Sequence, residues 1–166
     1  MKIAVQEGIK EVLFPKKIQS CAFTGHRELG ADFSPIRLMN AVDECLARGA
    51  RVFYNGVARG FDLLAAECVL NRKKLYGDIK LVACVPYLRQ ADAFKDEDKC
   101  RYDRILKESD EVVVIQEEYT RWCMAKRNDY MAQKADVLIA YCTKETGGSA
   151  YTVKKFRKKG GYILFV

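Results

Sequence analysis

The sequence lacks the patterns that mark several common classes of protein. Among its 166 residues it has one histidine, one tryptophan and three prolines. No apolar run approaches the roughly 18 residues that a membrane-spanning helix needs, and the first residues lack the apolar stretch of a signal peptide. Neither a GxGxxG dinucleotide fingerprint nor a GxxxxGK(S/T) P-loop occurs. We therefore expect no membrane partner, no P-loop nucleotidase and no standard dinucleotide site.

Close cysteine pairs are also missing. The chain has seven cysteines, and no two of them are closer than sixteen positions. Zinc sites use closer pairs, and disulfide scaffolds are short and cysteine-dense. Most of these cysteines lie in apolar runs, where a thiol behaves as a small hydrophobic group. We therefore predict a cytoplasmic protein without a metal site. A nucleophilic cysteine is disfavoured because the single histidine, His26, is far from most of them in sequence.

The charge of the chain is positive and local. Its composition, 49% hydrophobic and 31% charged, is that of one folded domain with a real core. The net charge is +7, yet five basic residues fall within 154–159 and no acidic residue follows Glu145. Cations also suit the end of a helix, where the helix dipole is negative. We therefore interpret the run as a solvated helix end and treat nucleic acid as an unlikely but open partner.

Apolar runs alternate between strand-like and helix-like patterns. The expected strands are 21–23, 51–54, 79–85, 112–115, 136–142 and 162–166. The expected helices run from Ser34-Pro35 to Gly49, and over 61–75, 91–108, 121–135 and from 149 to 159. This alternation predicts an α/β fold: a Rossmann-like three-layer sandwich with a mostly parallel sheet of five to six strands and helices on both faces. We interpret residues 1–19 as an N-terminal arm, in which a short strand is left open, and residues 20–166 as one domain.

Glycine-rich loops follow three of the predicted strands. The first strand ends at Thr24-Gly25, the second leads into Gly56 and Gly60, and the fifth leads into Gly147-Gly148. The carboxyl ends of parallel strands meet at one edge of the sheet, so these loops are expected together. Glycine lets the backbone approach an anion closely, and a helix N-terminus presents free N–H groups to it. The pattern therefore predicts a phosphate or nucleotide site at this edge.

The loops and neighbouring helices supply the candidate site residues. The predicted ligand-binding residues are Thr24, Gly25, His26, Arg27, Gly56, Arg59, Gly60, Asp62, Gln90, Asn128, Gly147, Gly148, Ser149 and Thr152. Arg27 and Arg59 are expected to neutralise phosphate charge. Asp62 either caps a helix or accepts hydrogen bonds from a ribose, and His26 is either a hydrogen-bonded loop residue or a ligand contact. Beyond a nucleotide ligand, no cofactor is predicted.

The sequence motifs resemble those of a known family. The segments Phe23-Thr24-Gly25-His26-Arg27 and Gly56-Val57-Ala58-Arg59-Gly60-Phe61-Asp62, followed by Val85-Pro86-Tyr87, Arg127-Asn128 and Gly147-Gly148-Ser149, are similar to YpsA-like proteins of the SLOG superfamily. The similarity covers about Ser20 to Val166. It implies a Rossmann-like fold with a pocket for a nucleotide-derived ligand such as ADP-ribose or an NAD derivative, and it suggests a homodimer.

Two other branches of the superfamily give alternative functions. Nucleotide phosphoribohydrolases carry a Pro-Gly-Gly-x-Gly-Thr-x-x-Glu element, and this chain has Thr146-Gly147-Gly148-Ser149-Ala150 in that place, without the proline and the third glycine. A nucleotide N-glycosidase would need a carboxylate near the ribosyl carbon, and Asp62 and Glu145 are the catalytic candidates. The other alternative is a single-stranded DNA-binding protein of the DprA type. Whether the chain is an enzyme stays open.

Overall fold

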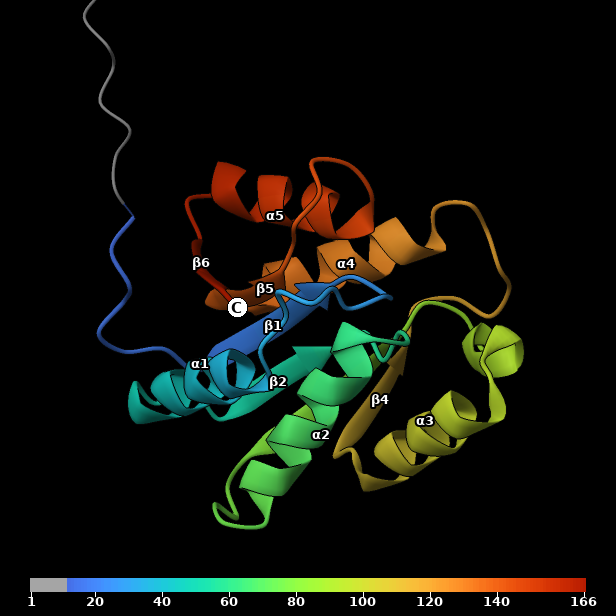
Figure 1. Cartoon of the computed structure of the whole chain (residues 1–166), viewed down its shortest axis with the longest axis horizontal. Coiled ribbons are helices and arrows are strands. Elements are labelled where there is room, and N and C mark those ends of the chain that lie inside the picture. The colour runs from blue at the N-terminus through green and yellow to red at the C-terminus, as the bar shows by residue number, and fades with distance from the viewer. Residues whose placement is uncertain (1–11) are drawn as a thin grey trace, which may run out of the picture.

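Six parallel strands form the centre of the computed structural model, which describes residues 12–166 (Figure 1). The strands are β1 (Ser20–Gly25), β2 (Val52–Asn55), β3 (Lys80–Val85), β4 (Glu111–Val114), β5 (Val137–Tyr141) and β6 (Tyr162–Phe165). The helices are α1 (Pro35–Ala47), α2 (Phe61–Lys73), α3 (Asp96–Glu108), α4 (Cys123–Lys134) and α5 (Gly148–Lys158), with a 3-10 helix η1 at Gln90–Ala93. Neighbouring strands are parallel throughout the sheet. The predicted Rossmann-like three-layer fold is therefore confirmed.

Alternate residues of the strands face two separate helix layers. On one face of the sheet, Cys21, Phe23 and Phe53 belong to a core that includes α1, α2 and α3. On the other face, Ala22 and Leu138 belong to a core that includes α4 and α5. Figure 1 shows the two helix layers above and below the sheet. Burial on both faces explains why the central strands read as continuous apolar runs in the sequence.

The direction in which the sheet grows reverses beside β1. The strand order is β4-β3-β2-β1-β5-β6. The chain therefore adds β2, β3 and β4 on one side of β1, and then crosses over to place β5 and β6 on the other side. The loops that leave β1 and β5 diverge at the carboxyl edge of the sheet, and such a switch point is where open α/β folds bind ligands.

The helix ends follow local chemistry, with one difference from the prediction. Ser34 Oγ accepts a hydrogen bond from Arg37 N at 3.3 Å, so Ser34 caps α1 as expected. The single helix expected over 91–108 is instead η1 followed by α3, because Phe94 and Lys95 adopt extended backbone angles. Phe94 packs edge-on against Tyr102, with ring centroids 5.6 Å apart, which fixes this break.

The described part of the arm, residues 12–19, forms no strand and lies against the domain. Phe14 stacks on Tyr162 with ring centroids 4.4 Å apart, and the Arg48 guanidinium lies 3.8 Å from the Phe14 ring centroid. Ile18 N donates to Arg48 O at 3.0 Å. Residues 1–11 of the predicted arm lie outside the described residues.

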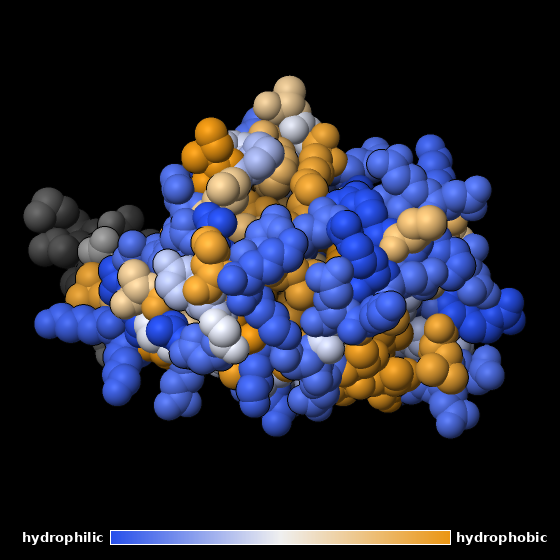
Figure 2. Space-filling view, turned by 90° about the horizontal axis from the view of Figure 1, so that it is seen from below, coloured by the Kyte–Doolittle hydropathy of each residue, from blue (hydrophilic) through white to orange (hydrophobic). Residues whose placement is uncertain are grey.

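The face of the molecule drawn in Figure 2 is mainly polar. Its hydrophobic residues lie in separate patches. All seven cysteines are free, and five of them are buried. Within residues 12–166, no helix is long and apolar enough to cross a membrane. The same residues contain no group of three or more His, Cys, Asp or Glu side chains that could hold a metal ion.

Gly60 is required where the start of α2 meets the β1–α1 loop. Its φ is +83°, and a Cβ there would overlap the backbone of Arg27. Gly160, after α5, also has a positive φ, of +79°, but a Cβ there would meet nothing within 4 Å. The two glycines therefore separate the cost of a left-handed backbone from the cost of a steric overlap.

We predict that Gly160→Ala lowers the free energy of unfolding by about 1 kcal/mol, the cost of the left-handed conformation alone. Gly60→Ala should lower it by at least ~1 kcal/mol more, because Arg27 must also move. Urea unfolding of both variants measures the difference. Equal losses would show that the β1–α1 loop does not press on the start of α2.

Candidate functional site

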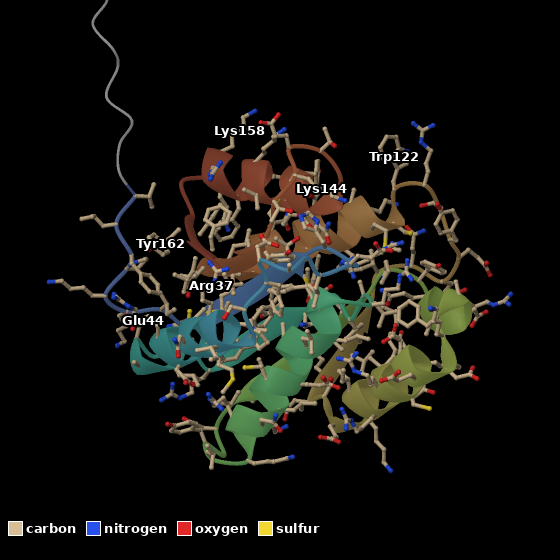
Figure 3. All side chains as sticks on the ribbon, in the orientation of Figure 1. Arg37, Glu44, Trp122, Lys144, Lys158 and Tyr162 are labelled. Carbon is tan, nitrogen blue, oxygen red and sulfur yellow. The ribbon has the colours of Figure 1, made fainter. Side chains whose placement is uncertain are left out.

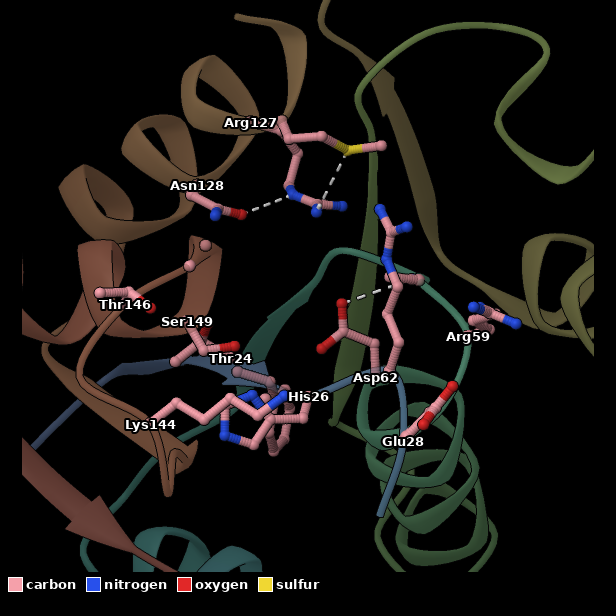
Figure 4. Close-up of a pocket in the computed structure, with 17 residues that line it drawn as sticks. Thr24, His26, Glu28, Arg59, Asp62, Arg127, Asn128, Lys144, Thr146 and Ser149 are labelled. Carbon is pink, nitrogen blue, oxygen red and sulfur yellow. Dashed lines mark hydrogen bonds between the residues drawn. The ribbon is translucent and has the colours of Figure 1, made fainter. Parts of the chain in front are cut away.

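A pocket of about 570 Å³ opens at the switch point of the sheet. Its walls come from the end of β1, from the segments that follow β1, β2 and β5, from the starts of α2 and α5, and from α4. The lining residues are Phe23, Thr24, Gly25, His26, Arg27, Glu28, Ala58, Arg59, Asp62, Met124, Arg127, Asn128, Lys144, Thr146, Gly147, Gly148 and Ser149. In Figure 4, Lys144, Thr146 and Ser149 stand on one side of the pocket and Asp62 and Arg59 on the other. A ligand in this pocket would bridge α2 and α5.

The β2–α2 loop forms a rigid part of the wall. Val57 has a φ of +46°, which is unusual for a β-branched residue and costs energy. Asn55 supports this turn, because its Oδ1 accepts from Val57 N at 2.8 Å and its Nδ2 donates to Asp62 O at 2.9 Å. Both Asn55 and the Val57 side chain are fully buried. The strained loop therefore owes its shape to a buried polar side chain.

Asp62 lies in the first turn of α2 and is buried. It is not the N-cap, because Gly60 occupies that position. Oδ2 of Asp62 accepts from Ala58 N at 3.3 Å, whereas Oδ1 is buried without any hydrogen-bond partner. Burial raises the pKa of Asp62 to about 6, although the Arg127 charge, the Ala58 N–H and the Arg27 charge all act to lower it. Of the two roles predicted for Asp62, helix capping is wrong.

Arg127 on α4 holds the ends of two strands. Its Nη1 donates to the carbonyl of Gly56, which follows β2, and to Cys84 O on β3 at 3.5 Å. Its Nε donates to Asn128 Oδ1 at 2.8 Å. Burial lowers the pKa of the Arg127 guanidinium, and the nearby Asp62 carboxylate opposes that shift. A positive charge is thereby fixed in the floor of the pocket.

The N-terminus of α5 opens into the pocket without a side-chain cap. Gly147 is its N-cap residue, with φ +97°, and a Cβ there would meet nothing within 4 Å. Asn128 Nδ2 lies 3.9 Å from the position that a Cβ of Gly148 would take. Since Asn128 Oδ1 is engaged by Arg127, its amide donor is turned toward the start of α5. The backbone N–H groups of this turn and the Asn128 amide thus converge as donors.

His26 joins the two diverging loops. Its Nε2 accepts from Thr143 N at 2.8 Å, and its carbonyl accepts from Phe61 N at 3.1 Å. Its ring packs edge-on against Tyr141, with centroids 5.4 Å apart. Burial is the main cause that lowers the pKa of His26, and the Lys144 charge adds to it. The neutral ring therefore accepts through Nε2 and carries its proton on Nδ1.

Ten of the fourteen predicted ligand-binding residues line the pocket. They are Thr24, Gly25, His26, Arg27, Arg59, Asp62, Asn128, Gly147, Gly148 and Ser149. The other four shape its walls from behind or lie beneath them. Gly56 O accepts from Gln90 Nε2 at 3.2 Å, Gly60 packs on Arg27, and Thr152 Oγ1 bonds back to Gly148 O at 2.9 Å.

Glu145 lies outside the pocket. It lines a neighbouring hollow with Cys142, Lys154 and Phe165. Only one of the two catalytic candidates, Asp62, is therefore in the pocket. Five further residues line the pocket and were not predicted from the sequence: Glu28, Met124, Arg127, Lys144 and Thr146. Lys144 and Thr146 lie in the loop after the fifth predicted strand, and Arg127 is next to the predicted Asn128 in sequence. Their position beside predicted site residues was therefore the one sequence feature that indicated them.

The chain is similar to proteins of one family over most of its length. The YpsA family model, described as the YspA SLOG family, matches residues 35–162. A UPF0398 protein of Bacillus cereus is 33% identical over 104 residues, which cover 61% of this chain and 56% of that protein. A UPF0398 protein of Bacillus thuringiensis (strain Al Hakam) matches with the same identity and coverage. The chain thus spans about half the length of the curated relatives it matches.

Two solved structures share the fold. The DNA processing protein A (DprA) of Streptococcus pneumoniae superposes with a TM-score of 0.65 at 18% identity, over 89% of this chain and 50% of that chain. The DNA processing protein A of Helicobacter pylori, which has a single-stranded DNA binding mode, superposes with a TM-score of 0.57 at 18% identity. It covers 84% of this chain and 62% of that chain. At this identity the likeness shows the fold.

We predict that Asp62→Asn stabilises the protein at pH 8 by about 1–3 kcal/mol, at 1.36 kcal/mol per pKa unit. The pKa of Asp62 rises from an ordinary 3.8 to about 6 on folding, so the folded state binds its proton more tightly than the unfolded state. Stability is then lost as the pH rises through this window, and asparagine avoids the loss.

Urea unfolding at pH 8 and at pH 3.5 tests this prediction. The gain should fall below ~0.5 kcal/mol at pH 3.5, where Asp62 is protonated in the folded state and mostly protonated in the unfolded state. Glu145→Gln, at an exposed position outside the pocket, is the control and should change stability by less than ~0.5 kcal/mol at either pH. If the Asp62→Asn variant were less stable than the original chain at pH 8, burial of the Asp62 carboxylate would not destabilise the folded protein, which contradicts the prediction.

Proposed function

We propose that the pocket of this chain, which belongs to the YpsA family of SLOG proteins, binds a nucleotide-derived ligand such as ADP-ribose or an NAD derivative. A phosphate group of this ligand binds at the N-terminus of α5. The observation that carries the proposal is the uncapped first turn of α5 facing a pocket at the switch point of the sheet. Free N–H groups at a helix N-terminus bind phosphate through hydrogen bonds and the helix dipole.

The charges around the pocket support an anionic ligand. Four cationic side chains line it against two acidic ones: Arg27, Arg59, Arg127 and Lys144 against Glu28 and Asp62. Since the pKa of Asp62 is raised to about 6, part of the acidic charge is neutralised at mildly acid pH. The local field therefore favours phosphate.

The size of the pocket supports a ligand larger than inorganic phosphate. Its volume of about 570 Å³ falls in the range of roughly 300–1,000 Å³ that is usual for small-molecule sites. Polar groups stand on two opposite walls: donors at the start of α5, and Arg59 with the Asp62 acceptor beside the start of α2 (Figure 4). A nucleotide fits this arrangement, because its phosphate and its sugar present different groups at a distance from each other.

The basic end of α5 gives less support to the DNA-binding alternative. Lys155 pairs with Asp129 at 2.7 Å, and Lys159 donates to the carbonyls of Ala132 and Ala135. In Figure 3, Lys158 projects from the far end of α5, away from Lys144. Much of this run thus stabilises the contact between α5 and α4, as cations at a helix end commonly do. The fold shared with the DprA proteins keeps single-stranded DNA as a competitor to be tested.

The N-glycosidase alternative has only one of its two predicted carboxylates in the pocket, and the other acidic side chain that lines the pocket, Glu28, is exposed to solvent. Asp62 lies in the pocket, but Glu145 lines a different hollow. Glycoside hydrolysis commonly uses two carboxylates that flank one bond. Binding is therefore the function that the geometry supports best.

We predict that Gly148→Pro weakens the binding of ADP-ribose or ADP about tenfold or more, the worth of one charge-assisted hydrogen bond. Proline at the first helical position keeps the helix but removes one N–H group from the first turn of α5. Gly148→Ala is the matched control, since its Cβ would meet only an ordinary contact at 3.9 Å and the N–H remains.

Isothermal titration calorimetry with ADP-ribose, NAD, ADP and a thymidine oligonucleotide measures these affinities. The original chain should bind at least one of the three nucleotides, and Gly148→Ala should bind it within threefold of the original chain. No heat from any nucleotide would overturn the proposal. Binding of the oligonucleotide alone would favour the DNA-binding alternative.

A further inference from the structure

We propose that the pocket selects ribonucleotides over deoxyribonucleotides, with Asp62 Oδ1 accepting a hydrogen bond from a sugar hydroxyl. The inference rests on the proposed function and names the class of ligand. It starts from a single atom of a residue that lines the pocket: Oδ1 of Asp62 is buried and has no hydrogen-bond partner among the described residues. In Figure 4 one oxygen of Asp62 is bonded to the loop, and the other is directed toward Thr24 and Ser149.

An unpartnered carboxylate oxygen in the interior is costly, so its persistence needs an explanation. Asp62 is only 6% exposed. The donor that lies closest along the loop, Ala58 N, already serves Oδ2. The guanidinium of Arg127 is directed elsewhere, with Nε on Asn128, Nη1 on the carbonyls of Gly56 and Cys84, and Nη2 on the Met124 sulfur. A molecule that enters the pocket can supply the missing donor.

The kind of donor follows from the charge of the pocket. A cationic amine would approach four lining cations, Arg27, Arg59, Arg127 and Lys144, and is disfavoured. A fully ionised phosphate has no proton to donate. A neutral hydroxyl meets both conditions, because it donates one hydrogen bond without adding charge.

The position of Asp62 relative to α5 indicates that the hydroxyl donor belongs to the ribose of a nucleotide. Gly147 and Gly148 are exposed at the rim, whereas Asp62 and Arg127 are buried in the floor. A phosphate at the rim therefore places the next chemical unit toward the floor. In a 5′-nucleotide that unit is the ribose, whose 2′ and 3′ hydroxyls are neutral donors, and the base follows only after it.

The groups that face Asp62 set how the interaction responds to pH. They are Arg27 in the β1–α1 loop, Arg127 on α4 and the Cys84 thiol on β3. Burial raises the pKa of Cys84 to about 12, so this thiol stays neutral. Burial also raises the pKa of Asp62 to about 6. The carboxylate is the stronger acceptor, so selection for the hydroxyl should be strongest above this pH.

Calorimetric titration with ADP, 2′-deoxy-ADP and 3′-deoxy-ADP tests the proposal directly. The original chain should bind at least one deoxy analogue about 10–100-fold more weakly than ADP, the worth of a hydrogen bond to a charged group. In Asp62→Asn the ratio of these affinities should fall below about threefold. Ribose 5-phosphate and 2-deoxyribose 5-phosphate repeat the comparison without a base, and inosine diphosphate removes the amine of adenine.

Each outcome decides between the assignments. Equal affinity of the original chain for ADP and both deoxy analogues would overturn the ribose assignment and leave nucleotide binding intact. Weaker binding of inosine diphosphate with no penalty for deoxy analogues would assign Asp62 to a base amine and overturn it as well. No binding of any of these ligands would overturn both this inference and the proposed function.

The pH dependence of the original chain keeps the test independent of any variant's folding. The ratio of the ADP and 2′-deoxy-ADP affinities (or of the 3′-deoxy-ADP pair, where the 3′ hydroxyl is the one selected) should fall as the pH is lowered from 8 to 5. Titration of His26 and of the ligand phosphate affects both nucleotides alike and cancels in the ratio. A ratio that stays constant over this range would contradict the role of the Asp62 carboxylate.

Discussion

The contact between the Arg127 guanidinium and the Gly56 carbonyl is the constraint on which the candidate site depends. It ties α4 to the end of β2, and the bond to Cys84 O extends the tie to β3. Gln90 Nε2 donates to the same Gly56 carbonyl from the β3 side. A Cβ at Gly56 would overlap the guanidinium and lie 2.8 Å from Asp62 Oδ2, so only glycine admits this packing. The buried cation thereby fixes the loop that presents Asp62.

The fold was largely predictable from the sequence, because its central strands are buried on both faces and helix α1 carries clear start and stop residues. Ser34, Pro35 and Gly49 delimit α1 as expected. The break between η1 and α3 was not predictable, because it depends on the packing of Phe94 against Tyr102. Charged residues on both sides of that break follow a helical pattern, and the sequence offers no local signal there.

The candidate site was predictable in outline and not in detail. Glycine loops at strand ends located the pocket, since parallel topology brings those ends together. Sequence neighbours in one loop face different ways, however: Lys144 borders both the pocket and the neighbouring hollow, whereas Glu145 borders only the hollow. The role of Arg127 depends on three acceptors, Gly56, Cys84 and Asn128, two of which are distant in sequence. Only tertiary structure shows that one side chain joins them.

The two ends of helix α5 have different structural roles. The N-terminal turn faces the pocket with free backbone donors, and the basic C-terminal end stabilises the contact with α4. The most direct test of phosphate binding at the first turn is an amide chemical-shift titration of the isotope-labelled protein with ADP. We predict that the amide signals of Gly148 and Ser149 shift most and that their shifts saturate as the ADP concentration rises. Shifts confined to 154–159, with Gly148 and Ser149 unchanged, would contradict this prediction.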